Sequence, residues 1–200
     1  DPNGTGRFFN GLIDEVCIYR RSLTQAEIRE QMHLVQLNAA DKGLVAYYQF
    51  NELADGVPVL DRVGTRHLGL NGDARRLPST LAVGPGFSAR RTLNAPGSYL
   101  FDLPVGLRIT TAASGILPDG ELCATRINLQ PDADPGAGPL SRSYWVLRHF
   151  GANQSFAPLE EIRFYHIGQT PYQSHVSDYK LWARPVQGEG NTWALTDVAD

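Results

Sequence analysis

Hydrophobic residues recur with the spacing of a β-strand near the start of the chain. The apolar positions of this stretch are Ile13, Val16 and Ile18. β-branched side chains favour extended backbone, so we expect a strand over residues 12–20. Asp14 and Glu15 stand together inside it and break the alternation of apolar and polar positions. This break predicts a bulge or a strand edge at these two residues.

A capped helix is expected directly after this strand. Thr24 is a good N-cap residue and Glu27 follows three positions later, which is the pattern of a capping box. Leu23 and Ile28 flank the cap with the spacing of a hydrophobic staple. The apolar stripe of the predicted helix comprises Ile28, Met32 and Val35. We expect the helix to end within residues 33–36.

The rest of the chain alternates short apolar runs with turn residues. Tyr47 and Tyr48 lie among apolar neighbours and predict a strand over residues 44–50. Further short strands are expected over residues 89–93, 98–101, 106–111, 121–128, 143–149, 161–167, 178–184 and 192–196. Residues 143–147 are apolar on both faces, which predicts a central strand with Trp145 as the anchor of the core.

Composition agrees with an all-β protein that folds in water. The 200 residues are 42% hydrophobic and 20% charged, and their 20 Gly and 13 Pro suit many turns. The net charge of -3 argues against a general nucleic-acid binder. No apolar run approaches the roughly 20 residues that span a bilayer, so no membrane insertion is expected. The chain has no initiator Met, and we expect it to be a fragment or a processed piece.

Two segments resemble laminin-G-like, concanavalin A-like jelly rolls. The run GLIDEVCIYRRSL and the predicted helix resemble the closing strand and helix of such a domain, whereas GLVAYYQFN resembles its opening strand. The closing motif comes first here, which implies a tandem array cut in mid-domain. The first and last strands of these jelly rolls are neighbours. We therefore expect residues 12–20 and 44–50 to pair antiparallel, or each to take a partner from outside the chain.

The last part of the chain resembles an immunoglobulin-like β-sandwich of secreted surface proteins in Bacteroidetes-type bacteria. The likeness lies in residues 95–101, 117–121 and 143–151. Together the resemblances imply an all-β fold with partial laminin-G-like jelly-roll elements, an immunoglobulin-like sandwich and one short helix near residues 24–35. The implied domains are residues 1–42 (the end of one laminin-G-like unit), 43–85 (the start of another, with a connector) and 86–200 (the sandwich).

No arrangement of residues in the sequence predicts catalysis. The nucleophile-elbow, zinc-protease, P-loop and C-x-x-C motifs are all missing. Glu160 and Glu161 are adjacent and would face opposite ways in a strand, whereas glycoside hydrolysis needs converging carboxyls. We therefore name no catalytic residue and expect a protein that is not an enzyme. Cys17 and Cys123, the two cysteines, are either bridged, as persists outside the cytosol, or free and buried.

Calcium is the one cofactor for which the sequence offers ligands. Laminin-G-like domains often carry Ca²⁺ at a loop edge, and this hard cation prefers carboxylate and carbonyl oxygens. The candidate ligands are Asp55 with Asp61, and Asp132 with Asp134. The alternative is that all four are turn-forming residues, because Asp side chains bond to their own backbone in turns.

A carbohydrate-binding face is the other candidate site, since exposed aromatic rings stack on sugars. Lys180 and Trp182 share one face of a predicted strand, and Arg163 and Tyr165 share one face of the strand before it. If the two strands are neighbours, these four residues form an aromatic and basic patch. The alternative places Trp182 in the core, with the stems of arginines lying over it.

These features predict a non-catalytic module of a large extracellular or cell-surface protein that acts in adhesion or structural assembly. The expected partner is a surface glycan or a protein, including neighbouring copies of the chain that complete its first sheet. The alternative is a carbohydrate-binding accessory module of a secreted hydrolase.

Overall fold

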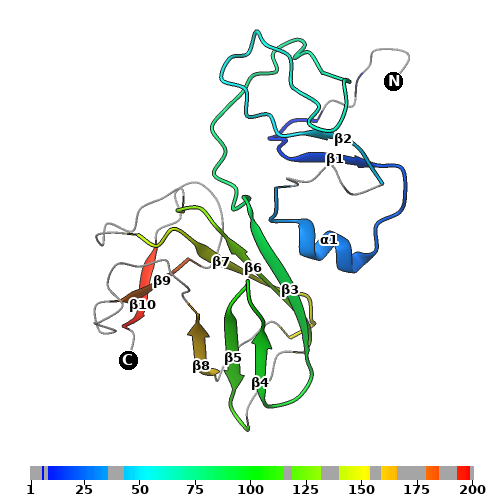
Figure 1. Cartoon of the computed structure of the whole chain (residues 1–200). Helices are drawn as coiled ribbons and strands as arrows, with labels where there is room; N and C mark the ends of the chain where they lie inside the picture. Colours follow the sequence, from blue (N-terminus) through cyan, green and yellow to red (C-terminus); the bar gives the residue numbers. More distant parts are fainter. Residues whose placement is uncertain are drawn as a thin grey trace. The chain divides into compact units, whose positions relative to one another are not determined.

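The fold is mostly β, as expected (Figure 1). The computed structural model describes residues 6, 9–35, 43–114, 119–131, 140–153, 159–165, 179–184 and 193–198. The elements are β1 (Val16–Tyr19), α1 (Gln25–Gln31), β2 (Leu44–Tyr48), β3 (Gly86–Leu93), β4 (Ser98–Phe101), β5 (Leu107–Thr111), β6 (Gly120–Ile127), β7 (Tyr144–His149), β8 (Leu159–Phe164), β9 (Lys180–Ala183) and β10 (Ala194–Val198).

The chain divides into two compact units. Unit 1 comprises Asp1–Ser22 and Asn38–Ser79, and unit 2 comprises Leu23–Leu37 and Thr80–Asp200. The helix α1 therefore belongs to unit 2, although it lies in the sequence between the two strands of unit 1. The domain boundaries expected from the sequence stay a prediction. No helix among the described residues has the length and apolar character needed to cross a bilayer.

Unit 1 is built on the antiparallel pair β1–β2, which confirms the expected pairing. Val16 lies opposite Tyr48, and Ile18 lies opposite Ala46. The outer edge of β2 is covered by the segment at Asp61, which forms a bridge with Tyr48. A small core lies on this sheet, and its members are Ala46, Tyr48 and Val59, with Val16, Phe50 and Leu70 packed against them. Among the described strands, β1 pairs with β2 alone.

The predicted irregularity near the start of β1 is present at Glu15. Its backbone has a φ of 51°, in the left-handed region that a residue with a side chain seldom adopts. The Asp14 carboxylate accepts a hydrogen bond from the Glu15 N–H at 2.9 Å and supports this turn of the backbone. The strand consequently begins at Val16 rather than at residue 12.

Unit 2 contains two three-stranded antiparallel sheets, β3-β6-β7 and β4-β5-β8. Both sheets contribute to one hydrophobic core, whose buried members are Leu93, Phe101, Val105, Leu107, Ile109, Leu122 and Ala124. A strand is formed at each of the eight places expected after residue 86; β4 has the expected bounds, and the other strands have shifted ends. The last two, β9 and β10, pair antiparallel as a separate sheet, in which Trp182 lies opposite Leu195.

Trp145 packs against this core, as expected, but its strand is not central. The Trp145 ring lies 4.8 Å from that of Phe164, and its Nε1–H donates to the Val105 carbonyl at 2.8 Å. Its strand β7 is an outer strand of the described sheet, and the middle position belongs to β6. The sequence of β6 conceals this because it contains the polar residues Glu121, Thr125 and Arg126, which are unusual in a central strand.

The helix α1 has the predicted capping box but is shorter than expected. The Thr24 hydroxyl accepts from the Glu27 N–H at 3.2 Å, and the Glu27 carboxylate accepts from the Thr24 N–H at 2.7 Å. The helix ends at Gln31 with Met32 as its C-cap, so Val35 lies beyond it. Ile28 and Met32, two members of the expected apolar stripe, are exposed.

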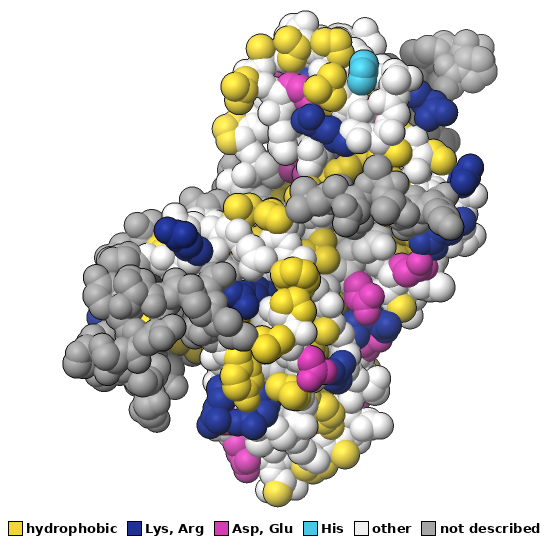
Figure 2. Space-filling model, viewed as in Figure 1, with side chains coloured by type: hydrophobic (Ala, Val, Ile, Leu, Met, Phe, Trp, Pro, Cys, Tyr) yellow, Lys and Arg dark blue, Asp and Glu magenta, His cyan; other side chains and the backbone are white. Residues whose placement is uncertain are grey.

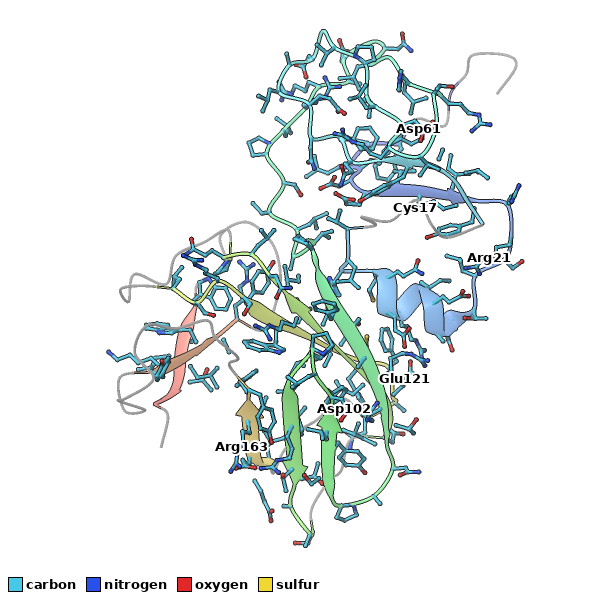
Figure 3. The ribbon with its side chains drawn as sticks, viewed as in Figure 1. Cys17, Arg21, Asp61, Asp102, Glu121 and Arg163 are labelled. Carbon is cyan, nitrogen blue, oxygen red and sulfur yellow. The ribbon has the colours of Figure 1, made fainter. Side chains whose placement is uncertain are left out.

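Charged side chains hold α1 on the outer face of the sheet β3-β6-β7. Along β6, Leu122 and Ala124 face the core, so Glu121 and Cys123 face the other way. Figure 3 labels Glu121 beside α1. Its carboxylate forms ion pairs with Arg29, at 2.9 Å, and with Arg90. Because this contact is ionic, the apolar positions of the helix do not mark its inner side.

Candidate functional site

A row of exposed hydrophobic side chains leads into β1 and continues along it. Phe9, Leu12, Ile13 and Ile18 are 68%, 74%, 56% and 47% exposed. Ile18 shares a face of β1 with Val16, which packs on the small core of unit 1. The core therefore ends beside Ile18 and leaves it half uncovered. We call these four residues the apolar row. Figure 2 shows hydrophobic side chains on the visible surface of the part that carries β1 and β2.

Charges of opposite sign flank β1 at its two ends. Asp14 and Glu15 precede the strand, and Arg20 and Arg21 follow it with exposed side chains. The Glu15 carboxylate accepts a hydrogen bond from the Tyr47 hydroxyl, and burial raises its pKa above the ordinary value. The Arg21 guanidinium lies 5.7 Å from the centre of the Tyr19 ring. Figure 3 labels Arg21 beyond the end of β1.

The Asp61 carboxylate, a predicted calcium ligand, binds backbone N–H groups. It accepts from Tyr47 at 3.1 Å, from Val63 at 3.0 Å and from Arg66 at 3.4 Å. Burial opposes ionisation of this carboxyl group, but these hydrogen bonds outweigh it and hold the pKa of Asp61 below its ordinary value. Asp61 therefore connects β2 to the turn at residues 63–66.

Asp55, the second predicted ligand in unit 1, lies in a turn that holds a guanidinium. Its carboxylate accepts from the Arg76 N–H at 2.7 Å. The Arg76 side chain donates to the Val57 carbonyl at 2.9 Å and to the Ala54 carbonyl, and it lies 3.5 Å from Glu52 Oε2. The oxygens that calcium would prefer are thus turned toward an arginine.

Calcium binding stays a prediction. Within the described ranges, no three His, Cys, Asp or Glu side chains are grouped so that they could hold a metal ion. Asp132 and Asp134, the other predicted ligands, lie outside the described residues. Cys17 and Cys123 are both free, so no bridge joins them; Cys123 is buried, as the second alternative expected, whereas Cys17 is only half-buried.

The predicted carbohydrate-binding residues lie on two different sheets. Arg163 is on β8, which pairs with β5, whereas Lys180 and Trp182 are on β9, which pairs with β10. The structure therefore does not join β8 and β9 as hydrogen-bonded neighbours. Tyr165 directly follows β8 and is half-buried. The four residues remain a prediction, now in two separate groups.

The group around Arg163 gains partners that the sequence did not indicate. Ile162 and Phe164 face the core, so Arg163, which lies between them in the strand, faces outward. Figure 3 labels Arg163 at β8. The Glu161 carboxylate forms an ion pair with Arg163 and lies 3.6 Å from Arg108 Nη2 on the neighbouring strand. Figure 2 shows Lys and Arg side chains beside acidic ones over this part of the surface.

Sequence reasoning missed a buried histidine behind α1. His33 is 5% exposed, and its Nδ1 lies 2.9 Å from the Ala82 carbonyl. The following backbone runs beside the 82–84 segment, where the Gly84 N–H donates to the His33 carbonyl at 3.2 Å. No local sequence signal marks such a residue, because its partners are far away in the chain.

No protein-family model, no curated protein and no solved structure matches the chain. The apolar row with its flanking charges is the surface feature with the clearest chemistry among the described residues.

Proposed function

We propose that the chain is a non-catalytic module of a large extracellular or cell-surface protein and that it serves adhesion or structural assembly. The observation that carries this proposal is the apolar row, because four large apolar side chains stay exposed within one short segment, and exposed apolar surface favours protein association. The resemblance of unit 1 to laminin-G-like jelly rolls agrees with an extracellular setting. The shared core of the two sheets in unit 2 agrees with an immunoglobulin-like sandwich.

Site-specific photo-crosslinking tests this function. Benzoylphenylalanine replaces Leu12 of the apolar row in the full-length protein, in the cells that make it. Leu77 is also exposed in unit 1 but lies outside the row, so it is the matched control position. We expect a crosslinked protein partner from position 12 and none from position 77. If position 12 gives no crosslink, the proposal is wrong.

A second candidate function is carbohydrate binding by an accessory module of a secreted hydrolase. It is favoured by the outward face of the sheet β4-β5-β8, where Glu161 lies between two arginines. Carboxylate and guanidinium groups bind sugar hydroxyls and acidic sugars through charge-assisted hydrogen bonds.

A glycan array separates the two predicted groups of sugar-binding residues. Loss of binding in Arg163→Ala places the ligand on β8, and loss in Trp182→Ala places it on β9. If the unaltered chain binds no glycan, this second function is excluded.

A further inference from the structure

We infer that the outward face of the sheet β4-β5-β8 binds a polysaccharide of uronic acids through Arg108 and Arg163. The inference rests on carbohydrate binding, the second candidate function, and names the chemical class of the sugar. We call these two arginines the basic pair. In the complex, the carboxylate of one uronic acid lies between their guanidinium groups, and a sugar ring packs against Tyr165.

The strand register places the basic pair side by side. Arg108 on β5 lies directly opposite Arg163 on β8. Arg108 faces away from the core, because Leu107 and Ile109 on either side of it are core residues. Side chains directly opposite on neighbouring strands have Cβ atoms about 4.5–5.5 Å apart, and like charges at such positions destabilise a sheet. An anion between the two guanidinium groups removes this repulsion.

The described part of the chain supplies one anion for these two cations. The Glu161 carboxylate forms an ion pair with Arg163, and its Oε2 lies 3.6 Å from Arg108 Nη2. The second distance is too long for a hydrogen bond. The three side chains together therefore carry one positive charge in excess, and Arg108 is the arginine that Glu161 neutralises less.

The Arg108 guanidinium lacks acceptors for its N–H groups. Its Nε is shielded from solvent without a hydrogen-bond partner, and its Nη atoms, which are not shielded in this way, donate to no described residue. The side chain is 30% exposed, so a ligand can reach its outer end. A guanidinium presents its donors in a planar fork that matches a carboxylate. A bound acidic group therefore provides what the described residues do not.

An aromatic side chain lies next along β8. Tyr165 follows Arg163 by two residues on the same face, about 7 Å further along the chain. The Tyr165 N–H donates to the Gly106 carbonyl at 2.8 Å, and a Cβ added to Gly106 would lie 3.4 Å from the Tyr165 Cβ. Gly106 thus contributes no side chain beside the ring. Aromatic rings stack on the apolar faces of sugar rings, so Tyr165 suits a sugar next to the bound carboxylate.

Hydroxyl groups on the other side of the basic pair favour a sugar over an acidic peptide. Thr110 lies opposite both Ser98 and Glu161, and its hydroxyl donates to the Ser98 Oγ at 3.3 Å. This row offers donors and acceptors to the hydroxyls of a sugar. A uronic acid carries hydroxyls, a carboxylate and an apolar ring face, which match the three parts of this surface. An acidic peptide offers the carboxylate alone.

Matched polysaccharides test the ligand class. Isothermal titration calorimetry of the whole chain measures binding to two polymers of uronic acids, polygalacturonate and alginate. The methyl ester of polygalacturonate has the same sugars without the charges. We expect at least one of the two acidic polymers to bind, at least tenfold more tightly than the ester, and to bind more weakly as salt is added. Polyglutamate, which is acidic but has no sugar ring, should not bind.

Substitutions locate the site. Arg108→Gln and Arg163→Gln each remove one guanidinium of the basic pair and should weaken binding of the acidic polymer about tenfold. The Arg163 side chain is 53% exposed, so Arg163→Gln keeps the fold and remains informative if Arg108→Gln does not. Tyr165→Leu removes the ring but keeps an apolar side chain, and it should also weaken binding. Arg142→Gln changes an exposed arginine outside this sheet and is the matched control.

Each outcome decides the question. A chain that binds neither polygalacturonate nor alginate overturns the inference, and so does binding that Arg108→Gln and Arg163→Gln leave unchanged. Equal binding of polygalacturonate and its ester leaves carbohydrate binding in place and rules out the acidic class. Equal binding of polyglutamate shows a site for charge alone, which contradicts the role of Tyr165. If no glycan of any kind binds, the second candidate function fails together with the inference.

Discussion

The His33 ring accepts a hydrogen bond from the Arg148 guanidinium, with Nε2 3.4 Å from Nε. A guanidinium only donates, so Nε2 carries no proton and Nδ1–H donates to the Ala82 carbonyl. The structure thus fixes one neutral tautomer of His33. Burial and the charge of Arg148 both favour this neutral form and hold the pKa of His33 below its ordinary value, although the Ala82 carbonyl opposes them.

Acid should therefore destabilise unit 2. The pKa of His33 is lower in the folded than in the unfolded protein, so unfolding takes up a proton below the unfolded value of about 6.5. Stability is unaffected by His33 above that pH, and falls with pH below it until the folded ring is also protonated. Thermal unfolding of the unaltered chain and of His33→Gln, from pH 7.5 to 4.5, measures this. We expect a shallower acid loss in His33→Gln, and equal slopes would contradict the assignment.

The charged groups near His33 are accounted for as follows, so the acid loss of stability is assigned to His33 itself. Arg148 on β7 is the charge that lowers the pKa of His33. Arg29, Glu30, Arg90 and Glu121 are ion-paired with one another across α1, β3 and β6. The two arginines hold the pKa of Glu121 below its ordinary value against the effect of burial, so it stays ionised above about pH 4.5.

Removal of the Glu121 carboxylate should loosen α1. Its oxygens pair with Arg29 and Arg90, and the Arg29 guanidinium also lies 4.1 Å from the Phe150 ring. Glu121→Ala leaves two half-buried cations without their shared anion, and we expect a loss of about 1–2 kcal/mol in the free energy of unfolding. Urea denaturation measures it. Glu161→Ala, at a more exposed pair, should cost less, and equal losses would rule out a special role for Glu121.

The capping box of α1 predicts a smaller, local effect. Thr24→Ala removes the hydroxyl that accepts from the Glu27 N–H and should cost about 1 kcal/mol. Thr24→Ser keeps an acceptor and should stay close to the unaltered chain. Hydrogen exchange over residues 25–31 separates the two variants. Unchanged exchange in Thr24→Ala would show that packing, not the cap, fixes the start of the helix.

Arg76 predicts how unit 1 responds to calcium. Its guanidinium already lies among the Glu52 carboxylate and the Ala54 and Val57 carbonyls, so added Ca²⁺ should leave the thermal unfolding of the unaltered chain unchanged at this turn. Arg76→Ala leaves the buried Glu52 carboxylate without this cation, and we expect a loss of about 2 kcal/mol.

Calcium should partly restore the stability of Arg76→Ala, because the freed oxygens suit a hard cation. Arg62→Ala is the control, since Arg62 also contacts Glu52 but is more exposed. A clear calcium effect on the unaltered chain, abolished by Asp55→Asn, would instead support the sequence expectation of a calcium site.

The strands of this protein are visible in its sequence because alternation and turn residues are local signals. β4 was predicted with its observed bounds, and the β1–β2 pairing followed from the resemblance to jelly rolls. The inner side of α1 was not predictable, since its contacts are ion pairs with residues about 60 to 90 positions away along the chain. The middle position of β6 in its sheet was also not predictable, because the face of β6 that α1 covers carries polar groups.

The candidate sites show the same limit. Asp55 and Asp61 have the sequence context both of a turn and of a metal site, and only the surrounding backbone distinguishes the two. Arg163 was placed on an outward face from alternation alone, whereas its ion pair with Glu161 beside Arg108 depends on the register of β5 and β8. The apolar row was visible as a hydrophobic run, but a sequence cannot say that such a run stays exposed.

The place of α1 in the chain has a consequence for how this protein is inherited and engineered. Residues 23–37 belong to unit 2, yet they are encoded between the two strands of unit 1. No single cut in the gene can release either unit whole. A gene fusion that transferred residues 80–200 alone would lack the helix that covers β6. A transfer that keeps unit 2 whole therefore has to include both units.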